Sequence, residues 1–174
     1  RLKSMILYLK DKFSISVEFA EEGFKENFSK RYYKEKKLLK ISNTLSRESK
    51  EFMIAQQIGL LAARSAIDRQ LELNGASDSN SLALGRTVLA NYFASALLMP
   101  YDLFWETAEK CRYDIDILCN RFDTSFEQVC HRLTTLQKDQ KKGIPFHFMR
   151  VDIAGNVSKR LSMSGLKIPR YSVA

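Results

Sequence analysis

One long apolar segment, residues 51–73, constrains the fold more than any other part of this sequence. Its residues, EFMIAQQIGLLAARSAIDRQLEL, repeat apolar side chains at helical spacing and predict one continuous amphipathic helix. Ser46 is a suitable N-cap, and Glu48 and Glu51 are expected in the first turn, where carboxylates complement the helix dipole. Two adjacent glutamines, Gln56 and Gln57, interrupt the apolar part. Either these amides lie on an ordinary solvated edge, or they occupy a functional position whose chemistry has been replaced.

The segments around this helix predict a small β component and further helices. Residues 30–46, KRYYKEKKLLKISNTLS, predict two strands around a lysine-rich turn, which is a hairpin. Pro100 ends the helix before it and suits the first turn of the helix after it. The other elements expected in this part of the chain are a helix over 1–13, a strand over 14–19, and helices over 81–99 and 101–111.

Residues 112–137, RYDIDILCNRFDTSFEQVCHRLTTLQ, predict two short helices with a break near Asp123. Such a pair could read DNA, but its second helix offers only His131 and Arg132 to phosphate, and its surroundings are acidic. A structural helix pair is therefore the favoured interpretation. The inward-facing residues are expected to be Ile115, Leu118 and Phe122 in the first helix and Phe126, Val129 and Leu133 in the second.

The last part of the chain predicts a β-hairpin. After the polar linker KDQKKG, residues 144–164 alternate, turn at a Gly-Asn pair and alternate again. The tail that follows has no closing element, so either the domain continues past Ala174 or the tail is mobile. We therefore predict an α+β fold with a mainly helical part over 1–137 and the start of a β-rich module over 138–174.

The net charge of +8 is concentrated at the two ends of the chain. Residues 1–40 carry 11 basic and 6 acidic side chains, residues 138–174 carry 8 and 2, and residues 41–137 carry 9 and 12. Basic ends favour an anionic partner, either nucleic acid or a phosphorylated small molecule. Solvated lysines are the alternative, and charge alone does not choose between them.

The cysteines and the apolar runs indicate in which compartment of the cell the protein is expected. Cys111, Cys119 and Cys130 are too few for a disulfide framework and match no zinc-finger spacing, so we expect buried thiols in a cytoplasmic protein. No run of 18 apolar residues occurs, so we expect no membrane span. No secretory leader is visible, and the chain begins at Arg1 rather than Met, so we expect a fragment of a longer protein.

Two strings in this order, FMIAQQIGLLA and ANYFASALLMP, resemble the ImmA/IrrE type of metallopeptidase domain. In that family the first helix carries His-Glu-x-x-His. The resemblance places Gln56 at the first zinc-binding histidine, Gln57 at the general base and Leu60 at the second histidine. The third ligand, an acid expected just ahead of Ala90, is absent, and Leu89 stands in that region.

These replacements argue against peptidase activity. A catalytic zinc needs about three protein ligands, and a leucine donates none. Gln57 cannot accept a proton near neutral pH, so water would lack its base. The two histidines, His131 and His147, lie on different predicted elements. We therefore expect a degenerate zincin-like domain that is not an enzyme and holds no zinc.

Longer strings resemble the short-chain fatty acyl transcriptional regulators, which are of the XRE type. LANYFASALLMPYDLF, the helix-pair segment and GIPFHFMRVDIAGNVSKR carry this resemblance over about residues 40–165. It implies a bacterial regulator of propionate, glyoxylate or related short-chain acid metabolism that senses acyl-CoA. It also implies an amino-terminal DNA-binding helix-turn-helix, absent from this chain, and a homodimer.

An acyl-CoA needs cations for its phosphates and an apolar pocket for its acyl chain. The candidate residues are Arg86, which is a lone cation on a largely apolar helix, Tyr92, Tyr101, Arg150, Lys159 and Arg160. The former metal cleft, between residues 56–60 and 87–93, is a natural cavity for the ligand. There we expect Gln56 and Gln57 to act as neutral hydrogen-bonding groups or to brace the neighbouring helix.

Two alternatives stay open. Some relatives carry an iron-sulfur cluster, and Cys119 and Cys130 lie in matching segments, although three thiolates leave a fourth cluster position open and ligands could follow Ala174. In function, a direct DNA- or protein-binding module, using the basic ends or the helix pair over 114–137, competes with the effector sensor. An enzyme is a distant third, because no nucleophile with its base and no phosphate loop is present.

Overall fold

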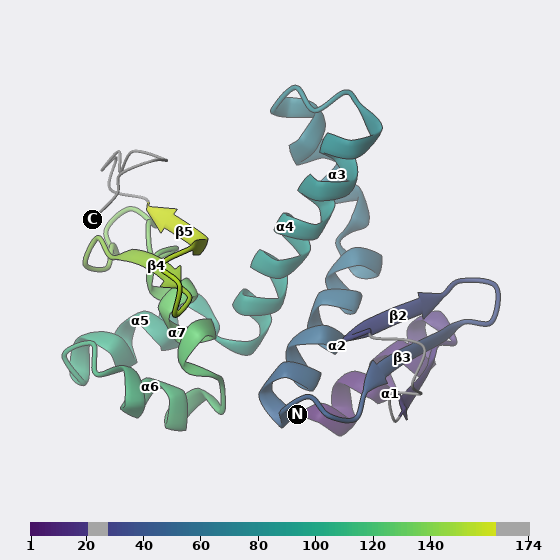
Figure 1. Ribbon diagram of the computed structural model, residues 1–174, viewed down its shortest axis with the longest axis horizontal. Helices are drawn as coiled ribbons and strands as arrows, with labels where there is room; N and C mark the ends of the chain where they lie inside the picture. The colour runs from purple at the N-terminus through teal and green to yellow at the C-terminus, as the bar shows by residue number, and fades with distance from the viewer. Residues whose placement is uncertain (21–27, 163–174) are drawn as a thin grey trace. The chain divides into compact units, whose positions relative to one another are not determined.

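The computed structural model describes residues 1–20 and 28–162, which form seven helices and five strands (Figure 1). The fold is α+β and mainly helical, with one small sheet and one separate hairpin, as predicted. In chain order the elements are α1 (Leu2–Phe13), β1 (Ser16–Ala20), β2 (Lys30–Tyr33), β3 (Leu38–Ser42), α2 (Arg47–Ala62), α3 (Arg64–Leu73), α4 (Ser79–Leu98), α5 (Tyr101–Lys110), α6 (Ile115–Phe122), α7 (Phe126–Leu133), β4 (His147–Val151) and β5 (Val157–Ser162).

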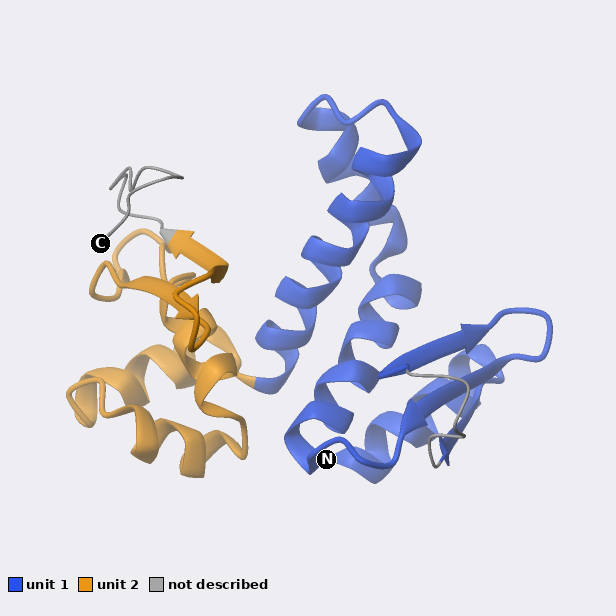
Figure 2. Cartoon of the chain, viewed as in Figure 1, with its two compact units in different colours: residues 1–98 blue, residues 99–174 orange. Residues whose placement is uncertain are grey.

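The chain divides into two compact units, residues 1–98 and residues 99–174 (Figure 2). The first unit holds α1 to α4 and the three-stranded sheet, and the second holds α5 to α7 and the hairpin. The domain boundary that we predict after residue 137 stays a prediction. Among the described residues no single helix is long and apolar enough to cross a membrane, and α4 with α5 passes that test only as a bent pair.

The sheet of the first unit has the order β1-β3-β2. β2 and β3 form the predicted antiparallel hairpin, whereas β1 pairs with β3 in parallel, from Ser16 opposite Leu38 to Ala20 opposite Ser42. The central strand buries Leu39 and Ile41. These side chains join one core with residues of the first two helices and of α4, namely Met5, Leu9, Ile54, Ala55, Ile58, Ala94 and Leu98.

The segment that the sequence predicts as one helix is two helices joined at Ala63. Ser46 caps α2 as predicted, its hydroxyl accepting the backbone N–H of Ser49. The continuous helix was wrong because the joint lets α3 turn Ile67 and Leu71 onto α4, where they pack with Ala90. Tertiary packing thus overrides a regular apolar period.

Glu51 has a different role from the one its position predicts. Its side chain is fully buried, and it forms ion pairs with Arg1 and Arg47. Glu48 does lie in the first turn of α2, as predicted. Glu51 therefore ties the start of α1 to α2 as well as meeting a residue on its own helix.

Two glycines allow the helices of the first unit to approach closely. A Cβ atom on Gly59 of α2 would lie 2.7 Å from Cδ1 of Phe93 on α4. A Cβ atom on Gly85 of α4 would lie 2.3 Å from Cδ2 of Leu71 on α3. Both distances are far inside van der Waals contact, so a larger residue at either glycine would require Phe93 or Leu71 to move.

The second unit contains the predicted helix pair around an apolar core. Asp114 and Ser125 cap α6 and α7, and Asp123 at the break adopts a left-handed conformation. Phe126 is 57% exposed, so the inward position predicted for it was wrong. It is the first residue of α7, beyond the edge of the core. The buried residues of that core are Met99, Phe104, Ala108, Leu118, Phe122, Val129, Leu133 and Leu136.

Local turn chemistry sets the remaining boundaries of the second unit. Pro100 is the N-cap of α5 rather than a residue of its first turn. β4 and β5 form the predicted antiparallel hairpin, with an irregularity between Arg150 and Val151. In its turn, Gly155 has a φ of +84°, and the Asp152 carboxylate accepts backbone N–H groups from the turn. The predicted end of the second strand and the tail, residues 163–174, lie outside the described residues.

Candidate functional site

The two glutamines of α2 are buried, so the solvated-edge alternative was wrong. Gln56 is 8% exposed and Gln57 is 3% exposed. Nε2 of Gln56 donates a hydrogen bond to Oδ1 of Asn91 on α4, at 2.5 Å. The amide of Gln56 therefore braces the neighbouring helix, which is one of the two roles that we expect for it.

Lys30 completes this group of polar side chains, which we call the Lys30 cluster: Lys30, Gln56, Gln57 and Asn91. Nζ of Lys30, on the first residue of β2, donates to Oε1 of Gln56 and lies 3.4 Å from Oε1 of Gln57. Within the described residues no carboxylate pairs with this ammonium. Burial alone lowers the pKa of Lys30 to about 8. Partial burial of a cation that meets no carboxylate of the described residues is costly, and this makes Lys30 a candidate functional residue.

The Lys30 cluster does not fit a zinc ion. Gln56 and Gln57 direct their oxygens at an ammonium group, which would repel a divalent cation. Leu60 and Leu89 are half-buried and pack against the apolar group around Ile67. Over residues 1–20 and 28–162 no group of three or more histidine, cysteine, aspartate or glutamate side chains has metal-binding geometry. The donors required for metal chemistry are thus replaced by amides, leucines and one lysine.

Arg86 and Tyr92 take different environments on α4. Arg86 is the lone cation on α4, as predicted, and its Nε donates to the Asp68 carboxylate on α3 at 2.7 Å. Tyr92 is 49% exposed, one position along from Asn91 of the Lys30 cluster. Arg86 therefore links α3 to α4, and Tyr92 presents an aromatic surface near the cluster in sequence.

The hydroxyl of Tyr101 is engaged with the polar linker. It accepts the backbone N–H of Lys138 at 2.8 Å and donates to the carbonyl of Lys141 at 3.0 Å. Nε1 of Trp105 donates to the carbonyl of Lys142 at 3.1 Å. The linker is thus held on α5 by two aromatic side chains, and the described contacts of Tyr101 are structural.

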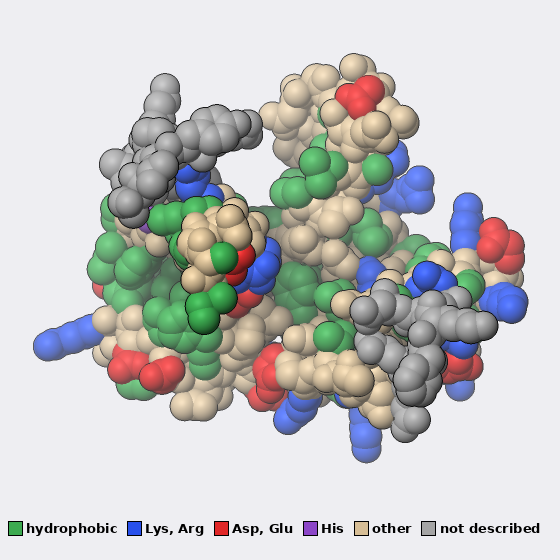
Figure 3. Space-filling model, viewed as in Figure 1, with side chains coloured by type: hydrophobic (Ala, Val, Ile, Leu, Met, Phe, Trp, Pro, Cys, Tyr) green, Lys and Arg blue, Asp and Glu red, His purple; other side chains and the backbone are tan. Residues whose placement is uncertain are grey.

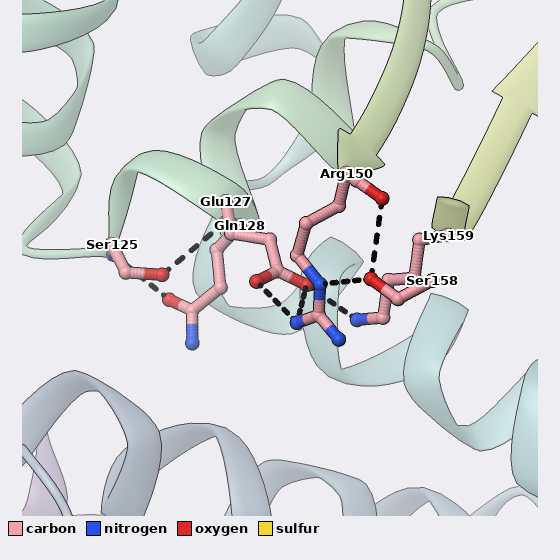
Figure 4. A network of polar contacts seen from close by, with 6 residues as sticks. All are labelled: Ser125, Glu127, Gln128, Arg150, Ser158 and Lys159. Atoms are coloured by element: carbon pink, nitrogen blue, oxygen red, sulfur yellow. Dashed lines mark hydrogen bonds and ion pairs between the residues drawn. The ribbon is translucent and has the colours of Figure 1, made fainter. Parts of the chain in front are cut away.

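Arg150 and Lys159, both predicted as ligand-binding residues, converge on one carboxylate (Figure 4). Nη1 of Arg150 lies 3.1 Å from Oε2 of Glu127 on α7, and Lys159 pairs with the other oxygen. Lys159, then Arg150, hold the pKa of Glu127 below its usual range. Nε of Arg150 also donates to Ser158 at 2.8 Å. Arg160 is exposed on β5. These contacts attach the hairpin to α7 and leave one positive charge in excess.

Two family matches cover nearly the whole chain. Residues 10–134 match the family described as the IrrE N-terminal-like domain, and residues 135–174 match the short-chain fatty acyl coenzyme A regulator, C-terminal. The chain belongs to the IrrE N-terminal-like domain family. The resemblances that the sequence carries to both families are thereby confirmed.

The relatives of this IrrE-like chain are transcriptional regulators. It is 39% identical to the HTH-type transcriptional regulator PrpR of Mycobacterium tuberculosis strain H37Rv, over 93% of this chain and 33% of that protein. The HTH-type regulator RamB of M. tuberculosis is 41% identical over 73% of this chain and 27% of its own length. The propionyl-CoA carboxylase regulator of Cereibacter sphaeroides is 36% identical over 78% and 30%. The chain thus spans about a third of these relatives.

A solved structure of a M. tuberculosis transcriptional regulator has the same fold. It superposes with a TM-score of 0.88 at 37% identity, and the match covers 97% of the IrrE-like chain and 51% of that structure. The family is named for a peptidase, but these relatives are named as regulators. The fold therefore serves regulation in the relatives of this chain.

The cysteines of the IrrE-like chain do not form a cluster site by themselves. Cys119 and Cys130 are half-buried, and burial is the main cause that raises the pKa of each thiol. Cys111 donates to the carbonyl of Ala108 at 3.6 Å. In the part of the chain that the structure describes, no third donor gathers with Cys119 and Cys130. An iron-sulfur cluster needs about four ligands, so these two cysteines would need further donors, and the cluster stays a prediction.

The sequence analysis missed Lys30 and the role of Asn91. Lys30 begins a segment rich in lysine, and its neighbours Lys34, Lys36 and Lys37 are exposed, so nothing local marks it. Figure 3 shows Lys and Arg side chains projecting from the sheet region of the first unit on the face drawn. Asn91 offered a weak signal, since it is a single amide within an apolar stretch of α4.

Proposed function

We propose that this chain is the effector-sensing part of a transcriptional regulator, that it binds a short-chain acyl-CoA, and that it has no peptidase activity. The observation that carries the proposal is the half-buried Lys30 ammonium, held by two buried glutamine oxygens where the family resemblance places metal chemistry. The family of residues 135–174 and the name of the C. sphaeroides relative both refer to acyl-CoA compounds.

Lys30 offers the chemistry that a thioester requires. An ammonium that pairs with no carboxylate of the described residues is a strong donor to a carbonyl oxygen, and its partial burial limits competition from water. In this arrangement the thioester carbonyl accepts a hydrogen bond from Lys30.

The absence of peptidase activity follows from the same residues. Gln57 accepts and donates hydrogen bonds but takes no proton near neutral pH, so a water nucleophile has no base there. Lys30 stabilises a carbonyl oxygen in the ground state without activating water. The domain then reports occupancy by its ligand, and chemistry on peptides plays no part.

The remaining partners belong to the whole regulator. We infer that DNA is bound by a helix-turn-helix outside this chain, because the relatives named as HTH-type are about three times as long. We further infer a homodimer, because such regulators bind paired half-sites. In the cell we place the regulator in the cytoplasm, with its DNA.

Calorimetric titration of the chain with propionyl-CoA, free CoA and duplex DNA tests the proposal. We expect saturable binding of propionyl-CoA that weakens by about 10- to 100-fold in Lys30→Met, because one hydrogen bond to a charged group is lost. Lys40→Met on β3 is the matched control, since Lys40 meets Glu18 at the surface, and its affinity should change less than about twofold.

Two results would contradict the proposal. One is the absence of saturable acyl-CoA binding to a folded chain. The other is tight, salt-sensitive binding of duplex DNA by this chain alone, which would favour a direct DNA-binding module, because phosphate contacts weaken steeply as salt rises.

A further inference from the structure

Among the described residues, one of the four tetrahedral bonding directions of Nζ of Lys30 has no partner. A lysine nitrogen has four substituents, of which one is its own carbon. Two of the other three directions point to Oε1 of Gln56 and Oε1 of Gln57. The last direction holds an N–H in the ammonium form and a lone pair in the neutral amine. The glutamines can hold both N–H bonds of the neutral amine and leave its lone pair available.

The orientation of this nitrogen is fixed from α4. Nε2 of Gln56 donates to Oδ1 of Asn91, so the carbonyl oxygen of Gln56 is turned toward Lys30. The amide of Gln57 lies on the next residue of the same buried helix. A nucleophile whose N–H bonds are held in this way is positioned before its substrate arrives.

Burial also supplies the reactive form of the amine. With a pKa of about 8, about a quarter of Lys30 is neutral at pH 7.5, against about one part in a thousand for an ordinary lysine. A lysine that is desolvated in this way is an established type of activated nucleophile.

We propose that Lys30 is a site of covalent acylation by short-chain thioesters, an inference that rests on the proposed binding of acyl-CoA. The neutral nitrogen attacks the thioester carbonyl carbon, an N–C bond forms and the C–S bond breaks. The departing thiolate takes up the proton that the nitrogen loses, so the products are an amide on Lys30 and a free thiol. No oxidant, reductant or second substrate is required.

Acylation would change the Lys30 cluster in a defined way. The amide is neutral, so the buried charge without a counter-ion disappears. One N–H remains to donate to one of the two glutamine oxygens, and the other oxygen loses its partner. The modified chain can no longer offer an ammonium to a second thioester. Acylation would therefore replace reversible ligand binding by a stable covalent modification.

The test follows the acylation rate of each lysine by peptide mass spectrometry. The chain is incubated with propionyl-CoA at pH 8, and Lys40, which is half-exposed on the neighbouring strand and meets Glu18, serves as the internal standard. We expect Lys30 to react at least about tenfold faster than Lys40 in the folded chain, and the difference to vanish in urea. Equal rates in the folded chain would overturn the inference.

A second probe separates this inference from the proposed function. The propionyl thioester of N-acetylcysteamine has the reactive group without the nucleotide. Selective labelling of Lys30 by this probe, with no saturable binding of propionyl-CoA, would support the reactive lysine and contradict acyl-CoA sensing. Saturable binding of propionyl-CoA, together with uniform labelling of lysines by both reagents, would support acyl-CoA sensing and contradict the reactive lysine.

A pH series gives a readout that simple exposure would not produce. The labelling rate of Lys30 should level off above about pH 9, when most of the amine is neutral, whereas the rate for an ordinary lysine keeps rising up to about pH 10. A labelling rate for Lys30 that keeps rising up to about pH 10 would contradict the arrangement described for Lys30.

Discussion

Gln56 on α2 donates a hydrogen bond to Asn91 on α4, and this bond decides which atom of the Gln56 amide meets Lys30. The two helices of the first unit thereby share one polar network inside an otherwise apolar contact. Such networks fix a unique arrangement only when their members are satisfied.

Replacing Asn91 by leucine should therefore destabilise the first unit. The buried amide of Gln56 would lose its acceptor, at a cost of about 1 to 3 kcal/mol in the free energy of unfolding. Urea denaturation measures this cost. Asn80→Leu is the control, because Asn80 lies exposed near the start of the same helix, and a change of equal size there would contradict the prediction.

Gly59→Ala tests the close approach of α2 and α4. The added methyl group meets the ring of Phe93 at 2.7 Å, and we expect a loss of about 1 to 3 kcal/mol in the free energy of unfolding. Adding Phe93→Leu should recover part of that loss, because the smaller side chain makes room. A double mutant that shows purely additive losses would mean that the ring is not the obstacle.

The attachment of the hairpin to α7 should depend on pH. Lys159 and Arg150 lower the pKa of Glu127, so the contact is complete above the ordinary glutamate value of about 4.3. It is lost as the pH falls through the lowered value. We expect Glu127→Gln at pH 7 to lower the hydrogen-exchange protection of the amides in β4 and β5, as acid does in the parent chain when each rate is compared with the intrinsic rate at the same pH. Glu106→Gln, which removes a carboxylate that meets Lys141, should leave the hairpin unchanged.

Restoring histidines should not by itself restore a zinc site. In a chain carrying Q56H, Q57E and L60H, the Lys30 ammonium would still lie against the metal position and repel the ion. Adding K30M should strengthen zinc binding by at least about tenfold, measured by competition with a chromogenic chelator. Equal affinities with and without K30M would show that Lys30 does not oppose a metal.

Local signals in the sequence predicted the elements that depend on neighbouring residues. Ser46 and the Gly-Asn pair near residue 155 each favour one backbone conformation, so the α2 start and the last turn were confirmed. The break at Ala63 carries no proline or glycine, and only packing of α3 on α4 reveals it. The parallel pairing of β1 with β3 is likewise a long-range choice.

The candidate site was also predicted only in part from the sequence. The resemblance marked Gln56, Gln57 and Leu60, because substitutions inside a familiar pattern can be seen in one sequence. Lys30 comes from a strand 26 residues before Gln56, and only the fold brings its ammonium to the amides. Its burial is a property of the assembled helix and sheet, so composition gave no sign of it.

The position of β2 in its sheet has a mechanical consequence. Its neighbour is β3, and within the described residues its other side makes no ladder. A peripheral strand is displaced by opening one row of backbone hydrogen bonds, whereas a central strand requires two. The ionisable group that meets the helix amides thus sits on an edge strand of the sheet, where a small gain or loss of interaction energy can be converted into movement.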